Sequence, residues 1–178
     1  MSGRKSFAEL EYTFVFDGHE LVYRYSKISV DVLKEERLSI DGKEVIYYDF
    51  LSRDGFTLLE GSDTLNSSIK NESPISRVKY VSSNSILADS TQNQVFKKFI
   101  DFVDRMLLFY SLRCRGYEGF MNGDKGIAEG IVNAGKVKDF EKFLKENDID
   151  YNLYECELDG RKAIYCHFEY SRKVLNNY

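Results

Sequence analysis

The two histidines are the residues of this chain that most directly suggest metal binding or acid–base chemistry. His167 and Glu169 stand two residues apart in a segment with strand character, so both side chains would point to the same side and could supply two metal ligands. A zinc site needs further ligands at a characteristic spacing, and no such partner accompanies them. His19 stands beside an Asp-Gly turn. We interpret both histidines as solvated or interface residues and predict neither a metal site nor a catalytic residue.

Glycines concentrated in residues 116–126 invite comparison with a phosphate-binding loop. Such a loop has the pattern GxxxxGK[ST], in which backbone amides wrap the phosphates and the lysine neutralises them. Here Lys125 precedes a glycine rather than a serine or threonine, and Asp124 would repel a phosphate. We therefore expect a flexible connection between two helices and no cofactor-binding residue in this stretch.

The three cysteines have no CxxC spacing, so they indicate neither zinc nor a disulfide framework. A two-residue turn at Asp159-Gly160 would place Cys156 opposite Ala163 and Cys166 opposite Leu153. The two sulfur atoms would then be too far apart along the strands to form a disulfide. Reduced thiols and a cytoplasmic location are the prediction.

Composition favours a globular domain with a substantial core. The 178 residues are 43% hydrophobic and 15% aromatic, enough for one domain. Lys+Arg 25 against Asp+Glu 29 gives a net charge of −4, which disfavours bulk nucleic-acid binding. No apolar run approaches the ~20 residues of a membrane-spanning helix, and no signal peptide is evident.

Tyr23, Arg24, Tyr25 and Lys27 combine aromatic rings with cations, as a surface that stacks nucleic-acid bases does. The expected strand register turns both tyrosines toward the side of the other large apolar residues, which favours a core role. A second basic set lies on an expected helix and is interleaved with acidic residues, which is typical of a solvated face. Its members are Lys136, Lys138, Lys142 and Lys145.

Four Asp-Gly pairs predict tight hairpins, because both central residues of a type I′ turn need positive φ. Closing the first hairpin at Asp17-Gly18 gives a register whose faces agree in chemistry. It pairs Phe14 with Leu21, Tyr12 with Tyr23, Leu10 with Tyr25 and Glu11 with Arg24. Closing the last hairpin at Asp159-Gly160 puts Tyr154, Cys156, Leu158, Ala163 and Tyr165 on one face and a Glu157–Lys162 pair on the other.

Helical periodicity begins after a short expected strand at 78–81. Thr91 and Gln94 match a capping box, which explains Gln92 and Gln94 without a nucleotide-binding role. The apolar stripe that follows is Val95, Phe99, Phe102, Val103, Met106 and Tyr110. A second helical region is expected over 127–146, with Val137, Phe140 and Leu144 directed inward.

The order of strands, helices and strands predicts a single α+β domain spanning 1–178. Its antiparallel β-sheet of hairpins has two main helical regions inserted before a C-terminal hairpin. The expected parts are a β-meander over 1–59, a mobile loop over 60–74, a strand plus helical region over 75–147 and the hairpin over 148–170.

Several segments, taken in order, resemble the middle region of AAA-type, ABC/SMC-like ATP-binding proteins linked to abortive infection and phage defence. The segments are ELEYTFVFDGHELVYRYS, RVKYVSSNSIL, DRMLLFYSL, KVKDFEKFLKENDIDYNLYE and GRKAIYCHFEY. The Walker A, signature and Walker B motifs of that family are missing here. No catalytic residue of the family can therefore be placed on this sequence.

The resemblance implies a non-catalytic structural or interaction portion of a larger ATPase. The parent protein would bind ATP and Mg²⁺, and the implied partners are the missing lobes of the ATPase, a second copy of the parent and an effector protein. Two alternatives remain open: a stand-alone protein-interaction module, and an aromatic module that binds single-stranded nucleic acid. Salt-sensitive oligonucleotide binding that is lost in Tyr23→Ala or Arg24→Ala would favour the last of these.

Overall fold

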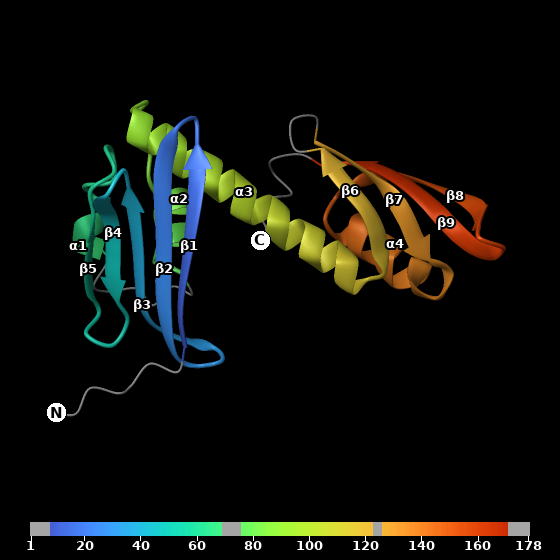
Figure 1. Cartoon of the computed structure of the whole chain (residues 1–178), viewed down its shortest axis with the longest axis horizontal. Coiled ribbons are helices and arrows are strands. Elements are labelled where there is room, and N and C mark those ends of the chain that lie inside the picture. Colours follow the sequence, from blue (N-terminus) through green and yellow to red (C-terminus); the bar gives the residue numbers. More distant parts are fainter. Residues whose placement is uncertain (1–7, 69–75, 123–125, 171–178) are drawn as a thin grey trace. The chain divides into compact units, whose positions relative to one another are not determined.

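Two compact units, residues 1–100 and 101–178, make up the computed structural model, which describes residues 8–68, 76–122 and 126–170. Each unit carries its own antiparallel sheet (Figure 1). The long helix α3 (Thr91–Cys114) supplies 91–100 to the first unit and 101–114 to the second. The α+β class built from antiparallel hairpins is confirmed, and the hairpins divide between two sheets.

The sheet of the first unit is a five-stranded meander in which sequential strands are neighbours. Its strands are β1 (Ala8–Phe16), β2 (His19–Ser29), β3 (Val32–Ile40), β4 (Lys43–Asp49) and β5 (Asp54–Thr57). Positive φ angles of 53° at Asp17 and 84° at Gly18 close the first hairpin as predicted. The predicted register is also confirmed, including the pairing of Tyr12 with Tyr23 and of Glu11 with Arg24.

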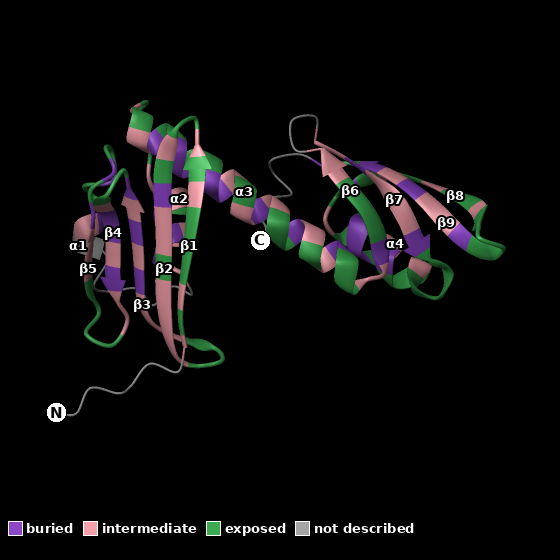
Figure 2. Cartoon of the chain, in the orientation of Figure 1, coloured by how far each residue is buried: buried purple, intermediate pink, exposed green. Residues whose placement is uncertain are grey.

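Two helical segments cover one face of this sheet. Alternate strand residues such as Leu21, Leu38 and Ile46 are buried there, beside Val81 of α2 (Arg77–Asn84) and Phe96 of α3. The banding along β3 in Figure 2 shows this period of two. The core of the first unit therefore lies between the meander and the helices.

The strand predicted at 78–81 is wrong, because these residues lie within α2. Val78 and Val81 are three residues apart, and both are buried on one side of the helix. Ser76 caps the helix by accepting a hydrogen bond from the backbone N–H of Lys79 at 3.2 Å. A valine-rich segment this short fits either structure by pattern alone, and the cap favours the helix.

The predicted cap of α3 is shifted by one residue. The Ser90 carbonyl accepts from Gln94 N at 2.9 Å and the Ser90 hydroxyl from Asn93 N at 3.4 Å. The Gln94 side chain donates to Asp89 at 2.9 Å. Ser90, rather than Thr91, therefore takes the capping role.

The segment expected to be a mobile surface loop, 60–74, packs into the first unit over its described part. It contains the short helix α1 (Leu65–Ser68), and both Ser62 and Leu65 are buried. The Asn66 side chain accepts from Thr57 N at 2.9 Å and donates to Thr57 O at 3.1 Å. Residues 69–74 of the prediction lie outside the described residues.

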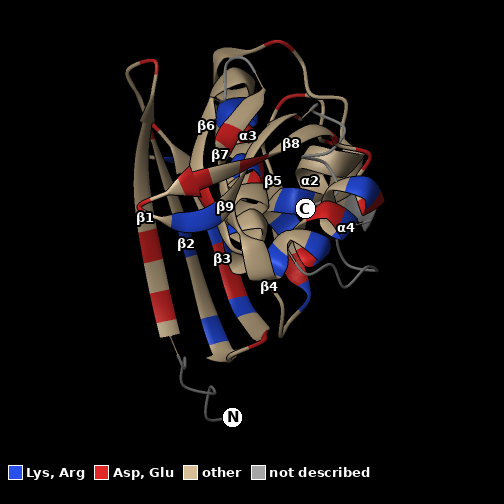
Figure 3. Cartoon of the chain, turned by 90° about the vertical axis from the view of Figure 1, so that its right-hand side faces the viewer, with Lys and Arg blue, Asp and Glu red and all other residues tan. Residues whose placement is uncertain are grey.

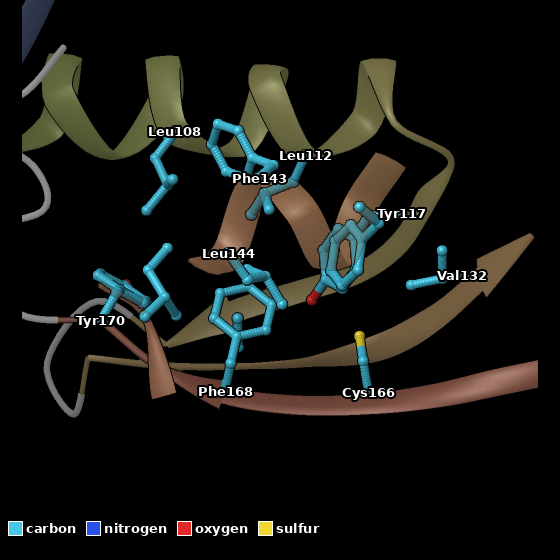
Figure 4. Close-up of a cluster of buried hydrophobic side chains, with 12 residues drawn as sticks. Leu108, Leu112, Tyr117, Val132, Phe143, Leu144, Cys166, Phe168 and Tyr170 are labelled. Carbon is cyan, nitrogen blue, oxygen red and sulfur yellow. The ribbon is translucent and has the colours of Figure 1, made fainter. Parts of the chain in front are cut away.

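The second unit has a four-stranded antiparallel sheet in the order β6-β7-β9-β8. Its elements are β6 (Tyr117–Asn122), β7 (Ile127–Asn133), the 3₁₀ turn η1 (Ala134–Lys136), α4 (Val137–Glu146), β8 (Asp150–Leu158) and β9 (Arg161–Glu169). The end of α3 and α4 contribute to a buried apolar cluster on one face of the sheet (Figure 4). The predicted inward positions Phe140 and Leu144 are confirmed as buried.

Two sequence expectations fail in this unit. The glycine-rich stretch contains strand β6 rather than a helix–helix connection, and 127–133 form strand β7 rather than the start of a helix. The cause is visible at Gly119 and Gly130, which face each other across the two strands. The Tyr117 ring covers this glycine pair, and its hydroxyl donates to the Phe120 and Glu129 carbonyls at 2.9 and 2.8 Å. The glycines therefore make room for a buried aromatic ring within a sheet.

Candidate functional site

The histidines lie in pairs with carboxylates. His167 Nδ1 is 3.0 Å from Glu129 Oε1 on the neighbouring strand β7, and His19 Nδ1 is 2.8 Å from Asp41 Oδ2. Glu169 is exposed near the end of β9. Within the described residues, no group of three or more His, Cys, Asp or Glu side chains is arranged to hold a metal. Lys125 and Asp124, weighed above for phosphate binding, lie outside the described residues.

The aromatic set proposed for base stacking is divided between the two faces of the first sheet. The Tyr23 hydroxyl donates to Glu36 at 2.6 Å, and its ring lies 5.5 Å from the Phe99 ring. Burial, then the Glu36 carboxylate, raises the pKa of Tyr23 well above its ordinary range. Arg24 lies on the opposite face, paired with Glu11. Figure 3 shows charged residues as coloured bands along the strands. Tyr23 therefore belongs to the core and does not form a stacking surface with Arg24.

A buried polar network around Glu36 was missed by the sequence reasoning. The carboxylate is fully buried and accepts from four groups. They are Tyr23 OH (2.6 Å), Ser76 Oγ (2.8 Å), Arg77 N (2.6 Å) and Val78 N (3.2 Å). Two of the donors are backbone amides at the start of α2, where a negative charge is favoured. The network fixes α2 on the sheet, which is a structural role.

The predicted basic residues are all exposed, with Lys136 in η1 and Lys138, Lys142 and Lys145 on α4. Lys145 pairs with Glu141 at 3.0 Å and Lys142 with Glu146 at 3.6 Å, both one helical turn apart. The Tyr151 hydroxyl also donates to Glu141, at 2.6 Å. Tyr151 and Lys145 together lower the pKa of the Glu141 carboxyl.

The cysteines are free in the structure. Cys156 lies opposite Ala163 and Cys166 opposite Leu153, as the hairpin geometry predicts. Cys166 is buried, and its desolvation raises the pKa of the thiol to about 12. A thiol with that pKa is a poor nucleophile at neutral pH.

The apolar stripe predicted for α3 is only partly buried. Its members Val95 and Phe99 are buried, whereas Phe102, Met106 and Tyr110 are 39%, 50% and 69% exposed. In the second unit the buried apolar residues of α3 are Leu108 and Leu112, which the prediction left out. The expected stripe therefore faces outward over this part of the helix.

A groove of about 390 Å³ lies between this outward side of α3 and strand β6. Its lining is Phe102, Arg105, Met106 and Phe109 from α3, Gly119, Phe120 and Met121 from β6, and Tyr170. Phe120 remains 58% exposed. Two other surface hollows, of about 450 and 620 Å³, have mixed linings that include Glu9, Arg24 and Arg37 in one and Glu118, Arg161 and Lys162 in the other. The groove is the more apolar surface.

Two features of the groove suit it to an extended segment of protein. β6 is the end strand of its sheet, with no strand paired to its far side among the described residues. Arg105 is half-buried in the lining, and its Nε atom is buried without a hydrogen-bond acceptor among the described residues. An occupant with apolar side chains and one carboxylate or carbonyl group would complement both features.

Comparisons of the chain with protein-family models, with curated proteins and with solved structures found no match. No described helix is both long and apolar enough to cross a membrane.

Proposed function

We propose that this chain acts by binding another protein rather than by catalysing a reaction, and that the groove between α3 and β6 is its binding surface. The observation that carries the proposal is the outward apolar side of α3, where Phe102 and Met106 line the groove beside the half-exposed ring of Phe120. Exposed apolar surface of this kind, rimmed by polar residues, is typical of protein-interaction sites.

The expected partner segment is an extended chain that lies along the β6 edge. Its backbone would pair with β6, its apolar side chains would enter the groove, and an acidic side chain would meet Arg105. This mode needs no change in the sheet, because the edge is already in strand geometry.

The partner can be captured by placing a photo-crosslinking amino acid at Met106 and, as a control, at Tyr110. Both positions are exposed on α3, but only Met106 lines the groove. A partner crosslinked from Met106 and not from Tyr110 supports the proposal. Equal capture from both positions would contradict it.

A separate proposal concerns the larger protein to which this chain would belong, and it rests on the sequence resemblance. We propose that the chain is a non-catalytic part of an ATP-binding protein of the abortive-infection and phage-defence group. ATP and Mg²⁺ would be held by segments outside this chain, and the partners would be the other ATPase lobes, a second parent copy and an effector. One resembling segment, RVKYVSSNSIL, has lost support because its expected strand is helix α2.

Measurements of nucleotide binding and hydrolysis test whether the chain is part of an ATPase. The chain alone should bind no Mg-ATP, whereas the parent with its flanking segments should hydrolyse it. A parent protein that neither binds nor hydrolyses ATP would remove the ATPase proposal and leave the protein-binding proposal intact.

We also propose a cytoplasmic location, which the free Cys114, Cys156 and Cys166 thiols support. Thiol titration of the protein isolated and unfolded without reductant should find all 3 cysteines reactive. A disulfide in that material would count against a reducing compartment.

A further inference from the structure

Strand β1 forms an unusually long and regular edge of the first sheet. It has 9 residues, against a common strand length of about 5–6. Its register with β2 is continuous from Ala8–Lys27 to Phe16–His19, whereas the β2–β3 and β3–β4 pairings contain bulges. Natural edge strands are usually protected by charged side chains, above all lysine, by proline, by a bulge or by an inward-pointing charge. β1 has no lysine, proline, bulge or inward-pointing charge, and its only charged residues are Glu9 and Glu11.

The hairpin geometry determines which backbone groups of β1 point away from the sheet. A two-residue turn makes Phe16–His19 a hydrogen-bonded pair, so Phe14, Tyr12 and Leu10 also direct their N–H and C=O groups toward β2. The backbone groups of the alternate residues face outward. These are Glu9, Glu11, Thr13 and Val15.

The apolar side of β1 is only partly covered by its own unit. Tyr12 and Phe14 stack with ring centroids 6.4 Å apart, and Phe14 and Phe16 with centroids 6.1 Å apart. Tyr12, at the middle of the strand, is 42% exposed. No residue of β1 is fully buried. The edge therefore offers a row of aromatic side chains together with outward hydrogen-bonding groups.

The sequence of β1 is complementary to itself in one antiparallel register. With Tyr12 on a twofold axis, all residues of the strand are paired between two copies. The pairs are Ala8–Phe16, Glu9–Val15, Leu10–Phe14, Glu11–Thr13 and Tyr12–Tyr12. Aromatic and aliphatic side chains then meet on one face, and no two like charges stand opposite each other.

Neighbouring registers are disfavoured by charge. Centring the axis on Glu11 would place the two Glu11 carboxylates opposite each other, and centring it on Thr13 would place Glu9 opposite Asp17. In the Tyr12 register the two Glu11 side chains are diagonal neighbours, and each is paired with Arg24 of its own chain. Charge complementarity therefore selects a single register.

We propose that two copies of this chain associate through antiparallel pairing of β1 with β1, which joins two five-stranded sheets about a twofold axis at Tyr12. An isologous contact of this kind uses the same patch on both copies and closes on itself. The surface lies in the first unit, so this association is independent of the proposed groove in the second.

The oligomeric state is measured by sedimentation velocity over a range of concentrations for the unaltered chain, Thr13→Pro and Thr13→Ala. Proline at position 13 removes an outward N–H but no β1–β2 hydrogen bond, so the hairpin should persist and circular dichroism should be unchanged. Thr13→Ala keeps the N–H. Concentration-dependent dimers are expected for the unaltered chain and Thr13→Ala. Thr13→Pro should weaken association by at least about tenfold, or ~1.4 kcal/mol.

Disulfide trapping tests the register without any loss of backbone hydrogen bonds. Across the twofold axis, the two residues at position 12 would form a non-hydrogen-bonded pair with Cα atoms about 4.5 Å apart, within disulfide range. In a Cys114→Ser background, Tyr12→Cys should form covalent dimers under a mild copper–phenanthroline oxidant. The control Val30→Cys should not, although Val30 is more exposed (67%) than Tyr12 (42%).

A monomeric unaltered chain at the highest attainable concentration would overturn the proposal. So would Thr13→Pro associating as strongly as Thr13→Ala, or equal disulfide formation from positions 12 and 30.

Discussion

Glu36 is a buried carboxylate whose partners come from β2, from the residue before α2 and from the first turn of α2. Its hydrogen bonds to Tyr23 and Ser76 and to the amides of Arg77 and Val78 tie the helix to the sheet. The Arg77 guanidinium adds a contact with the Tyr48 ring at 3.9 Å. These contacts explain why a short, polar helix holds a fixed place on the meander.

Replacing Glu36 by alanine should strongly destabilise the first unit, because it leaves the Tyr23 and Ser76 hydroxyls and two helix amides without this acceptor. We expect a loss of roughly 2–4 kcal/mol in the free energy of unfolding, measured by urea denaturation. The exposed Glu20 on β2 is the control, and Glu20→Ala should change stability by less than about 0.5 kcal/mol. Similar losses in both variants would contradict the structural role of Glu36.

Glu141 provides a pH test at the residue scale. The Tyr151 hydroxyl, followed by Lys145, holds the pKa of the Glu141 carboxyl below its ordinary value of 4.5. A lowered pKa in the folded state means that the associated stabilisation is present above pH 4.5 and is lost as the pH falls through the folded value. NMR titration should show Glu141 titrating below 4.5, and Tyr151→Phe should move that midpoint upward. No movement would show that the hydroxyl is not the main cause.

At the scale of elements, three of the four predicted Asp-Gly turns close hairpins, at Asp17, Asp41 and Asp159. The fourth prediction is wrong, because Asp54 and Gly55 lie within β5 and pair with β4. Asp-Gly turns and alternation gave the β1–β2 and β8–β9 registers residue by residue, because both signals are local. The sequence reasoning missed helix α2. Its cap Ser76 is a local signal, but the other acceptor at its start, Glu36, lies about forty residues earlier in the chain. Gly119 of β6 was taken for part of a flexible connection and Gly130 of β7 for part of a helix, because the role of both glycines depends on a contact with Tyr117.

The difference between local signals and distant contacts also explains why the groove was not predicted. Periodicity placed Val95 and Phe99, which are buried, on one stripe with the exposed Phe102, Met106 and Tyr110. It left out Leu108 and Leu112, which are buried in the second unit. Which part of an apolar stripe is buried depends on what packs against it, and over Phe102 and Met106 the helix is left half-exposed beside β6. The sequence therefore shows the apolar residues of the groove, but it does not show that they are exposed.

The glycine pair gives a test of how β6 and β7 are built. A Cβ atom at Gly130 would lie 2.4 Å from the Glu118 carbonyl and 2.7 Å from the Gly119 Cα, both backbone atoms. Gly130→Ala should cost roughly 1–3 kcal/mol of unfolding free energy. At Gly135 the nearest contact is 3.4 Å, to the Asn133 side chain, so Gly135→Ala should be nearly neutral. Thermal unfolding of both variants provides the comparison, and a tolerated Gly130→Ala would argue against the close approach of these strands.

At the scale of the whole molecule, two compact units present different surfaces for association. The first offers the regular β1 edge with its aromatic row, and the second offers the apolar groove beside β6. Both are strand edges, and strand addition is the mode of association that suits them. A chain with two such surfaces fits a role in assembly, in which one edge joins copies and the other receives a partner.

The most direct test of the central claim is the affinity of the captured partner for the unaltered chain, Met106→Glu and Tyr110→Glu. Both variants replace an exposed residue of α3 by glutamate, so the added charge is matched, but only Met106 lines the groove. Circular dichroism checks that both variants are folded. We predict that Met106→Glu weakens binding by at least about tenfold, or ~1.4 kcal/mol, while Tyr110→Glu binds as the unaltered chain does. Unchanged affinity in Met106→Glu, or an equal loss in both variants, would contradict the assignment of the groove as the binding surface.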